Sequence, residues 1–366
     1  MKKRMGSVWI CFFMFVCLCA GCRKTDGMMA LTVCTSMDED MAFTYLAEFK
    51  KYHPDIGVQL MFIDETGIEE VLRLPESERP DVVWGCSAVE LTKMAADGLL
   101  LPHASVNIKA LKPEFMDTVN SPPMWIGMSV YVNCFVLSEY RVFKDPMPVP
   151  CRYDDLLSQA LKNGIVIPDP LKTGTGFMFV SAILQKYGEE KGWEYLTRLD
   201  ENVMYYTDEP SSPVKEVGRG NCLVGISYLA RAENELKKNA PIIITVPEGT
   251  GWDIEANALV KKSSIHPMAR VFLDWAVSDI MMKIYARHSL MVGLIGIEGK
   301  KDNRYVVDGH QASSTMFVPN ELKWAANQKG KIMKEWQKRF GWKCRNESRS
   351  FHPKKASFKG DASQAD

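Results

Sequence analysis

The sequence lacks an excess of charge of either sign, because 45 lysines and arginines balance 45 aspartates and glutamates. Proteins that bind nucleic acid concentrate basic residues, so this balance argues against such a partner. Beyond the N-terminal segment, no apolar run approaches the roughly 18 residues that a membrane-spanning helix requires. What is left is a globular chain whose 46% of hydrophobic residues can bury a sizeable core.

Catalytic and metal-binding motifs are also missing. The chain contains neither a GxSxG elbow nor an HExxH pair. Its histidines show no metal-ligand spacing, and none lies in the segments considered below as anion sites. We therefore predict a protein that is not an enzyme and has no cofactor and no metal site. The six histidines are His53, His103, His266, His288, His310 and His352.

Beyond the N-terminal segment, cysteine pairs of the CxxC type are absent as well. Six cysteines follow the N-terminal segment, and several stand in apolar, strand-like text such as "LTVCTS" and "VNCFVL". That setting favours buried thiols over a disulfide framework. These six are Cys34, Cys86, Cys134, Cys151, Cys222 and Cys344.

The N-terminus reads as a targeting segment. A basic "MKKRMG" precedes the apolar "SVWICFFMFVCLCA", which is shorter than a spanning helix. Small Ala20 and Gly21 stand before Cys22, in the pattern of a bacterial lipobox, although Cys19 takes the position of the usual apolar residue. We predict a signal peptide over 1–21, lipidation of Cys22 and a tether over 22–30, the alternative being an uncleaved anchor. The rest of the chain would then lie in the periplasm or at the cell surface.

Strand-like and helix-like segments alternate after the tether. The order β-α-β-α-β over the first third predicts a parallel sheet with helices on both faces. Two strand-like passes, around 130–137 and 254–260, join this unit to a second α/β unit, which implies two lobes with a cleft between them. We expect lobe 1 over 31–132 and lobe 2 over 133–253. We expect a return to lobe 1 with C-terminal helices over 254–342, including one amphipathic helix from "HPMARVFLDWAVSDIMMKIYAR", and a disordered tail over 343–366.

Small polar residues and glycines follow the predicted strands four times. They stand at Thr35 and Ser36, at 85–87, at 173–176 and at 225–227. In open α/β sheets ligands bind beyond the carboxyl ends of the strands, often at helix N-termini. The repetition indicates a ligand site in the cleft.

Four segments together resemble the extracytoplasmic solute-binding proteins of ABC importers, in the ferric-iron, phosphonate and sugar-phosphate branch. They are "PDVVWGCSAVELTKMAADGLL", "PDPLKTGTGFMF", "NVMYYTDEPSSPVKEVGRGNCLVGISY" and "PEGTGWDIEANALVKKSSIHPMARVFLDWAVS", within a stretch from about Leu31 to about Gly293. The resemblance implies a two-lobed type II periplasmic-binding fold of the α/β class. It also implies capture of a small solute by closure of the lobes and delivery to permease subunits, with Cys22 as the membrane tether.

An anionic solute bearing phosphate or phosphonate fits the residues best. Thr173, Thr175 and Gly176 would open a helix whose first N–H groups have no internal partner. Ser211 and Ser212 offer a second such place, and Thr35 and Ser36 would face both from the other lobe. Helix capping is the alternative for each hydroxyl residue.

Ferric iron is the alternative ligand. Iron-binding members of the family hold the metal with adjacent tyrosines, where this chain has only Tyr228, and one phenol is too few for Fe(III). Tyr205 and Tyr206 are adjacent, but they lie on an earlier strand.

The sequence says less about the part of the solute that carries the phosphate or phosphonate group. Sugar-phosphate binders carry a His-Asp pair where this chain has Ala230 and Arg231, which speaks against a hexose phosphate. Arg231 would pair with a carboxylate or phosphate, or else be a solvated arginine, and Asp253 would contact a hydroxyl or ammonium group, or else be solvated. Trp125 and Trp84 would wall the cleft or pack in the core. The predicted ligand-binding set is Thr35, Ser36, Gly85, Ser87, Trp125, Thr173, Thr175, Gly176, Ser211, Ser212, Tyr228, Arg231 and Asp253.

The partner protein is an open choice. The same closed form would suit a permease or a membrane histidine kinase for which the chain acts as sensor, and a surface adhesin or antigen on this fold is a third possibility. We expect a monomer.

Overall fold

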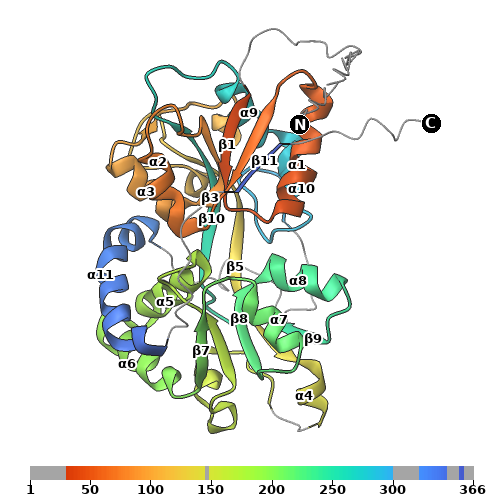
Figure 1. Ribbon diagram of the computed structural model, residues 1–366, viewed down its shortest axis with the longest axis vertical. Coiled ribbons are helices and arrows are strands. Elements are labelled where there is room, and N and C mark those ends of the chain that lie inside the picture. Colours follow the sequence, from red (N-terminus) through yellow and green to blue (C-terminus); the bar gives the residue numbers. More distant parts are fainter. Residues whose placement is uncertain (1–29, 145–147, 300–320, 344–353, 358–366) are drawn as a thin grey trace, which may run out of the picture.

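The computed structural model describes residues 30–144, 148–299, 321–343 and 354–357 of the chain. They form two α/β lobes linked by two long strands, β5 and β10, which run from one lobe to the other (Figure 1). β5 (Ile126–Ser138) and β10 (Trp252–Val260) pair in antiparallel fashion between the lobes. This arrangement confirms the predicted fold class and both linking strands.

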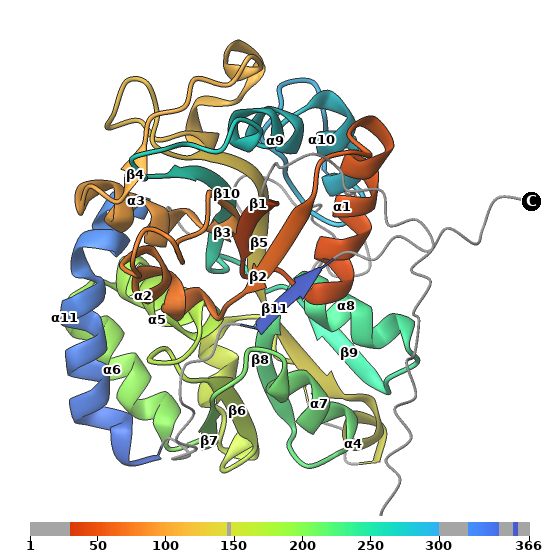
Figure 2. The ribbon, with the colours of Figure 1, turned by 45° about the horizontal axis from the view of Figure 1, so that its top comes forward.

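Lobe 1 is built on a sheet with the strand order β11-β2-β1-β3-β10. β1, β2 and β3 are parallel, as their connections through helices require, and β10 runs antiparallel to β3. The helices cover both faces of this sheet (Figure 2). The elements of lobe 1 are β1 (Leu31–Thr35), α1 (Glu39–Tyr52), β2 (Val58–Phe62), α2 (Ile68–Leu72), β3 (Val82–Ser87), α3 (Ala88–Ala96), β4 (Leu100–Leu101), α9 (Ala269–Ala276) and α10 (Asp279–Tyr285).

Lobe 2 continues the order as β5-β8-β6-β7, with β9 on β5. β6 is parallel to both β7 and β8, so their carboxyl ends face the cleft together. Its elements are α4 (Glu139–Lys144), β6 (Ile165–Pro168), α5 (Gly174–Tyr187), α6 (Glu189–Asp200), β7 (Val203–Thr207), α7 (Ser212–Gly218), β8 (Val224–Tyr228), α8 (Leu229–Lys237) and β9 (Ile242–Thr245).

The core of lobe 1 is an aromatic cluster beneath its sheet. Trp84 is fully buried and meets Phe272 at 5.3 Å and Tyr45 at 6.3 Å between ring centroids, both edge to face. Aromatic pairs of this geometry add stability beyond the area that they bury. Trp84 therefore packs in the core and does not wall the cleft.

Three segments differ in detail from the sequence-based expectation. The amphipathic helix expected near residue 270 is two helices, α9 and α10, because the side chain of Ser278 accepts a hydrogen bond from Met281 N and caps a new helix. Ser212 followed by Pro213 predicts a helix with Ser212 as its N-cap, but α7 begins one residue earlier, with Ser211 in the N-cap position. In the tail expected to be disordered, Lys354–Ser357 pair with β2 as β11.

The last long helix, α11 (Leu322–Phe340), packs mainly on lobe 2. Trp336 is buried against Tyr206 with ring centroids 5.0 Å apart, and the helix lies beside α6 in both views (Figures 1 and 2). Its other side reaches α3 of lobe 1 through an ion pair between Lys329 and Glu90. α11 therefore contacts both lobes at one flank of the cleft.

Candidate functional site

A cavity of about 90 Å³ lies between the lobes, where β1, β3, β8 and the start of α5 converge on the linking strands. We call it the cleft cavity. Its lining comes from both lobes and both linking strands and includes Ser36, Asp38, Asp64, Gly85, Tyr131, Lys172, Thr173, Gly174, Thr175, Tyr228 and Glu255.

The lobe 2 wall is the N-terminus of α5. Thr173 caps this helix, because its hydroxyl accepts a hydrogen bond from Gly176 N at 3.0 Å and donates one to Asp169 O at 3.0 Å. Such a cap is worth about 1 kcal/mol. The backbone N–H groups of Gly174 and Thr175 precede the first intrahelical bonds, and within the described residues neither donates to a protein acceptor. The exposed Lys172 lines the cavity beside them.

The lobe 1 wall is formed by the turns after β1 and β3. Gly85 has φ +66°, and a Cβ there would come within 2.8 Å of the Met37 side chain, so only glycine fits. Its N–H donates to Asn257 Oδ1 at 3.1 Å, and Ser36 donates its hydroxyl to Gly85 O at 3.1 Å. These bonds hold the two turns side by side.

Asp38 bridges the lobes across the cavity. Its carboxylate lies 3.0 Å from the Arg231 guanidinium and accepts a hydrogen bond from the Tyr228 hydroxyl at 2.9 Å. Burial, together with the neighbouring Asp38 carboxylate, raises the pKa of Tyr228 well above its usual range, so this phenol is a neutral donor. A second bond between the lobes joins the Thr66 hydroxyl to Lys172 O at 3.1 Å. The lobes are thus in direct contact on one side of the cavity.

Two carboxyl groups stand on one face of β10, because Asp253 and Glu255 are two residues apart in a strand. Burial is the main cause that raises the pKa of Asp253 to about 6, against hydrogen bonds from Ser87 and Tyr131. Burial also raises the pKa of Glu255 to about 7, and the carboxylates of Asp38 and Asp253 add to this effect. Glu255 lines the cleft cavity, whereas Asp253 lines a second, smaller pocket.

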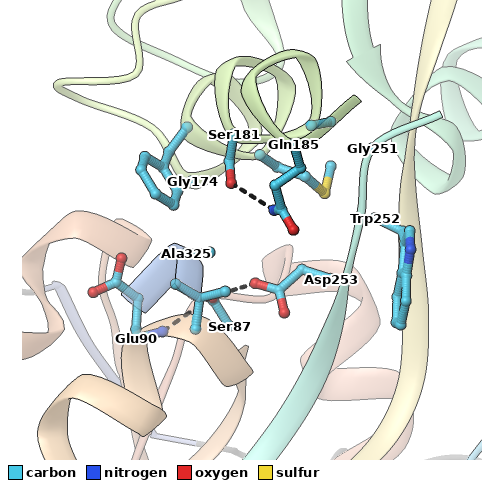
Figure 3. Close-up of a pocket in the computed structure, with 13 residues that line it drawn as sticks. Ser87, Glu90, Gly174, Ser181, Gln185, Gly251, Trp252, Asp253 and Ala325 are labelled. Carbon is cyan, nitrogen blue, oxygen red and sulfur yellow. Dashed lines mark hydrogen bonds between the residues drawn. The ribbon is translucent and has the colours of Figure 1, made fainter. Parts of the chain in front are cut away.

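A smaller pocket of about 20 Å³, the side pocket, lies under α11 and is lined by α3, α5 and the start of β10. Figure 3 shows its polar side chains bonded to one another. Ser87 donates to Asp253 and caps α3, and Gln185 donates to Ser181 at 3.1 Å. Gly174 lines both spaces, so the start of α5 is their common wall.

The predicted site residues divide between these places. Five line the cleft cavity, two line the side pocket, and Arg231 reaches the cavity through Asp38. The remaining five line neither space. The residues that line the cleft cavity are Ser36, Gly85, Thr173, Thr175 and Tyr228. Those in the side pocket are Ser87 and Asp253. Those that line neither space are Thr35, Trp125, Gly176, Ser211 and Ser212.

Local packing explains most of those five. The buried Thr35 hydroxyl accepts a hydrogen bond from Met37 N, and the Trp125 indole donates to the Thr92 hydroxyl inside lobe 1. Gly176 approaches the backbone so closely that a Cβ would lie 2.2 Å from Pro168 O. Ser211 and Ser212 stand at the start of α7, where no capping bond from the Ser211 side chain forms. Their assignment as ligand residues stays a prediction.

Five charged or phenolic lining residues escaped the sequence analysis: Asp38, Asp64, Tyr131, Lys172 and Glu255. A signal existed for two of them. Glu255 shares the strand face of Asp253, two residues away, and Lys172 directly precedes the threonine-glycine run. Nothing in the sequence shows that Asp38 meets Arg231, since 193 positions separate them.

Metal and disulfide chemistry were not expected. The described residues contain no group of three or more His, Cys, Asp or Glu side chains placed to hold a metal ion. Cys34, Cys86, Cys134, Cys151 and Cys222 form no disulfide bond with one another. Cys344 and the lipobox Cys22 lie outside the described residues. Among the helices that the structure describes, none has the length and apolarity to cross a membrane.

Comparison with known proteins supplies the biological context. Residues 77–306 match the profile of the family described as bacterial extracellular solute-binding protein. An uncharacterized protein of Haemophilus influenzae is 28% identical over 248 residues, 66% of this chain and 68% of the relative.

Two solved structures share the fold. The periplasmic binding protein AfuA of Actinobacillus pleuropneumoniae, with fructose-6-phosphate bound, has a TM-score of 0.74 at 21% identity, over 85% of this chain and 98% of its own. The apo ferric ion-binding protein A of Pasteurella haemolytica has a TM-score of 0.70 at 18% identity, over 87% and 99%. At these identities the likeness concerns the fold. The matched family is one of solute-binding proteins, which confirms the prediction that the chain is not an enzyme.

Proposed function

The chain belongs to the family of bacterial extracellular solute-binding proteins, and from this premise we propose that it captures a small solute bearing phosphate or phosphonate for an ABC permease. The observation that carries the ligand class is the start of α5. There the N–H groups of Gly174 and Thr175 are left without a protein acceptor, at the positive end of a 14-residue helix that faces the cavity. Lys172 adds a full positive charge at the same wall.

Ferric iron is the second candidate, because two phenols and three carboxylates, those of Asp38, Asp64 and Glu255, line the same cavity. The rings of Tyr131 and Tyr228 are 6.5 Å apart, with Asp38 and Glu255 nearby. Fe(III) requires anionic oxygen ligands, however, and Tyr228 is a neutral donor to an Asp38 that Arg231 already neutralises. The organic anion is therefore the better proposal.

We further propose that Cys22 carries a lipid anchor that holds the receptor at the membrane, and that the chain acts as a monomer. A sensor kinase is the alternative recipient of the closed form. Replacement of Cys22 by serine should release the expressed protein from the detergent-rich phase into the aqueous phase. Retention of that variant in the membrane would favour an uncleaved anchor instead.

The ligand class is tested by thermal unfolding of the protein without residues 1–22. A ligand at about 100 times its Kd adds about 2.7 kcal/mol to the free energy of unfolding, which raises the Tm by several degrees. Sugar phosphates and phosphonates should give this shift. A shift with ferric citrate alone would overturn the proposal in favour of iron.

Charge reversal at the cavity mouth gives a second test. Lys172→Glu places a carboxylate beside the anion site and should weaken binding of the phosphorylated ligand about tenfold or more. Lys191→Glu makes the same change on the exposed face of α6 and should leave affinity unchanged. Equal affinities of the two variants would contradict an anion at the start of α5.

A further inference from the structure

The two walls of the cleft cavity have opposite electrostatic character. The lobe 2 wall presents the amides of Gly174 and Thr175 and the Lys172 ammonium. The opposite wall and the linking strand present the carboxyl groups of Asp38 and Glu255. A solute that fills this space meets donors at one end and acceptors at the other.

The two carboxyl groups differ in what the protein provides for them. Asp38 has Arg231 at 3.0 Å and the Tyr228 hydroxyl at 2.9 Å. Glu255 accepts a hydrogen bond from the Ser129 hydroxyl on one oxygen, and no ion pair among the described residues includes it. Its charged neighbours in the site are other carboxylates, Asp38 and Asp253. A partly buried carboxyl in this setting is complementary to a cation that arrives with the ligand.

We propose that the solute is zwitterionic, with its anionic group at the start of α5 and an ammonium or similar cationic group against the carboxylate of Glu255. This inference rests on the proposed function and specifies the substrate class of the same site. Arg231 is then a closure residue that holds Asp38, and it is not the anchor of the ligand's anion.

The surroundings of Glu255 determine how binding depends on pH. A pKa near 7 means that the carboxyl is largely protonated in mildly acidic solution. A ligand cation favours the ionised form, so binding releases a proton and affinity rises with pH through about 7. A ligand hydroxyl that accepts a hydrogen bond from protonated Glu255 gives the opposite slope. The groups that face Glu255 from the packed elements are Asp253 on β10, Asp38 after β1, Tyr131 on β5, Tyr228 on β8, Tyr45 on α1, Tyr285 on α10 and, through Asp38, Arg231 on α8.

The experiment compares two probes that differ in one group, 2-aminoethylphosphonate and ethylphosphonate, by calorimetry between pH 5.5 and 8.5. The ammonium lowers the second pKa of its own phosphonate, so each affinity is first corrected for the measured phosphonate titration of that probe, and the ratio of the corrected affinities then isolates the effect of the ammonium on binding. We expect the amino compound to bind about tenfold more tightly at pH 8, with the ratio falling toward acid pH. Glu255→Gln keeps the shape of the side chain and should bring the ratio close to one at every pH. Glu189→Gln, at an exposed pair on α6, is the matched control and should behave as wild type.

The outcomes separate the inference from the proposed function. Equal affinities for the two probes would overturn the zwitterionic ligand and leave the proposed anion-binding function intact. The same conclusion would follow if Glu255→Gln unfolded at the wild-type temperature and kept the wild-type ratio of affinities. Binding of glucose 6-phosphate without binding of 2-aminoethylphosphonate does the same. Binding of ferric citrate alone removes the proposed function and the inference with it.

Discussion

The cleft cavity and the side pocket share the start of α5, yet they treat their polar groups differently. In the side pocket, Ser87 donates to Asp253 and Gln185 donates to Ser181 (Figure 3). The Glu90 carboxylate forms an ion pair with Lys329 on α11. In the cleft cavity, the amides of Gly174 and Thr175 have no protein acceptor among the described residues. The space also differs, with about 20 Å³ in the side pocket and about 90 Å³ in the cleft cavity.

This contrast is the reason to place the proposed binding site in the cleft cavity, because that cavity has backbone N–H groups without a protein acceptor among the described residues. A buried polar group costs free energy unless it is paired, so a folded protein pairs such groups wherever the site is structural. Groups left unpaired beside an open space are available to a ligand. The predictions below aim at the shared wall, at the carboxyls and at the side pocket.

A substitution that deforms the start of α5, which both spaces share, should cause the largest loss in the free energy of unfolding. In Gly176→Val a Cβ would lie 2.2 Å from Pro168 O and 2.7 Å from Pro170 N, and neither backbone atom can move aside cheaply. We expect a loss of about 3 kcal/mol or more in the free energy of unfolding, measured with chemical denaturant. Wild-type stability would show that α5 can shift, and that Gly176 is free to serve the ligand.

The raised pKa of Glu255 should appear in the stability of the ligand-free protein. Its pKa rises from 4.5 to about 7 on folding, so the folded state holds the proton more tightly. The resulting stabilisation is fully present below about pH 4.5 and disappears as pH rises through 7. Relative to Glu255→Gln, wild type should therefore lose about 2 kcal/mol between pH 4.5 and pH 8. Parallel pH profiles of the two proteins would mean that Glu255 titrates normally.

Breaking the contact between the lobes should have an intermediate effect. Asp38→Asn removes the carboxylate from Arg231, which is only 18% exposed at its side chain, at a cost of about 1–2 kcal/mol. Small-angle scattering should show a larger radius of gyration for the ligand-free variant. Asp279→Asn, at the exposed pair with Lys283, is the control and should change neither quantity. Identical scattering of Asp38→Asn and wild type would show that closure does not depend on this pair.

The smallest effect is expected in the side pocket. Gln185→Leu removes a bond to the Ser181 hydroxyl and one from Glu321 N, so unfolding should require about 1 kcal/mol less. Ligand affinity should stay within about twofold of wild type, since the change is below the 1.4 kcal/mol that a tenfold effect requires. A tenfold loss of affinity would instead place the ligand partly in the side pocket.

Local sequence signals located part of the site. The threonine-glycine run at 173–176 identified the start of α5, because a strand followed by small residues and an apolar run is a local pattern. The same signal could not tell which residues of that run line the cavity and which pack against the rest of lobe 2. Thr175 lines the cavity, whereas Gly176 serves the close approach of α5 to Pro168. Which side of a helix faces a cavity depends on what packs behind it.

The sequence by itself determined the alternating α/β order and the two linking strands, because periodicity and turn residues are properties of short segments. The family followed from the resemblance of four segments to known solute-binding proteins. The tertiary structure alone decided that Asp38 meets Arg231, that Glu255 takes part in no ion pair within the part of the chain that the structure describes, and that Asp253 is bonded to Ser87. These are relations between residues more than a hundred positions apart, and their energies depend on distance and burial after folding. Which charged side chains in the cleft are paired can therefore be known only from the folded structure, in which both lobes contribute residues.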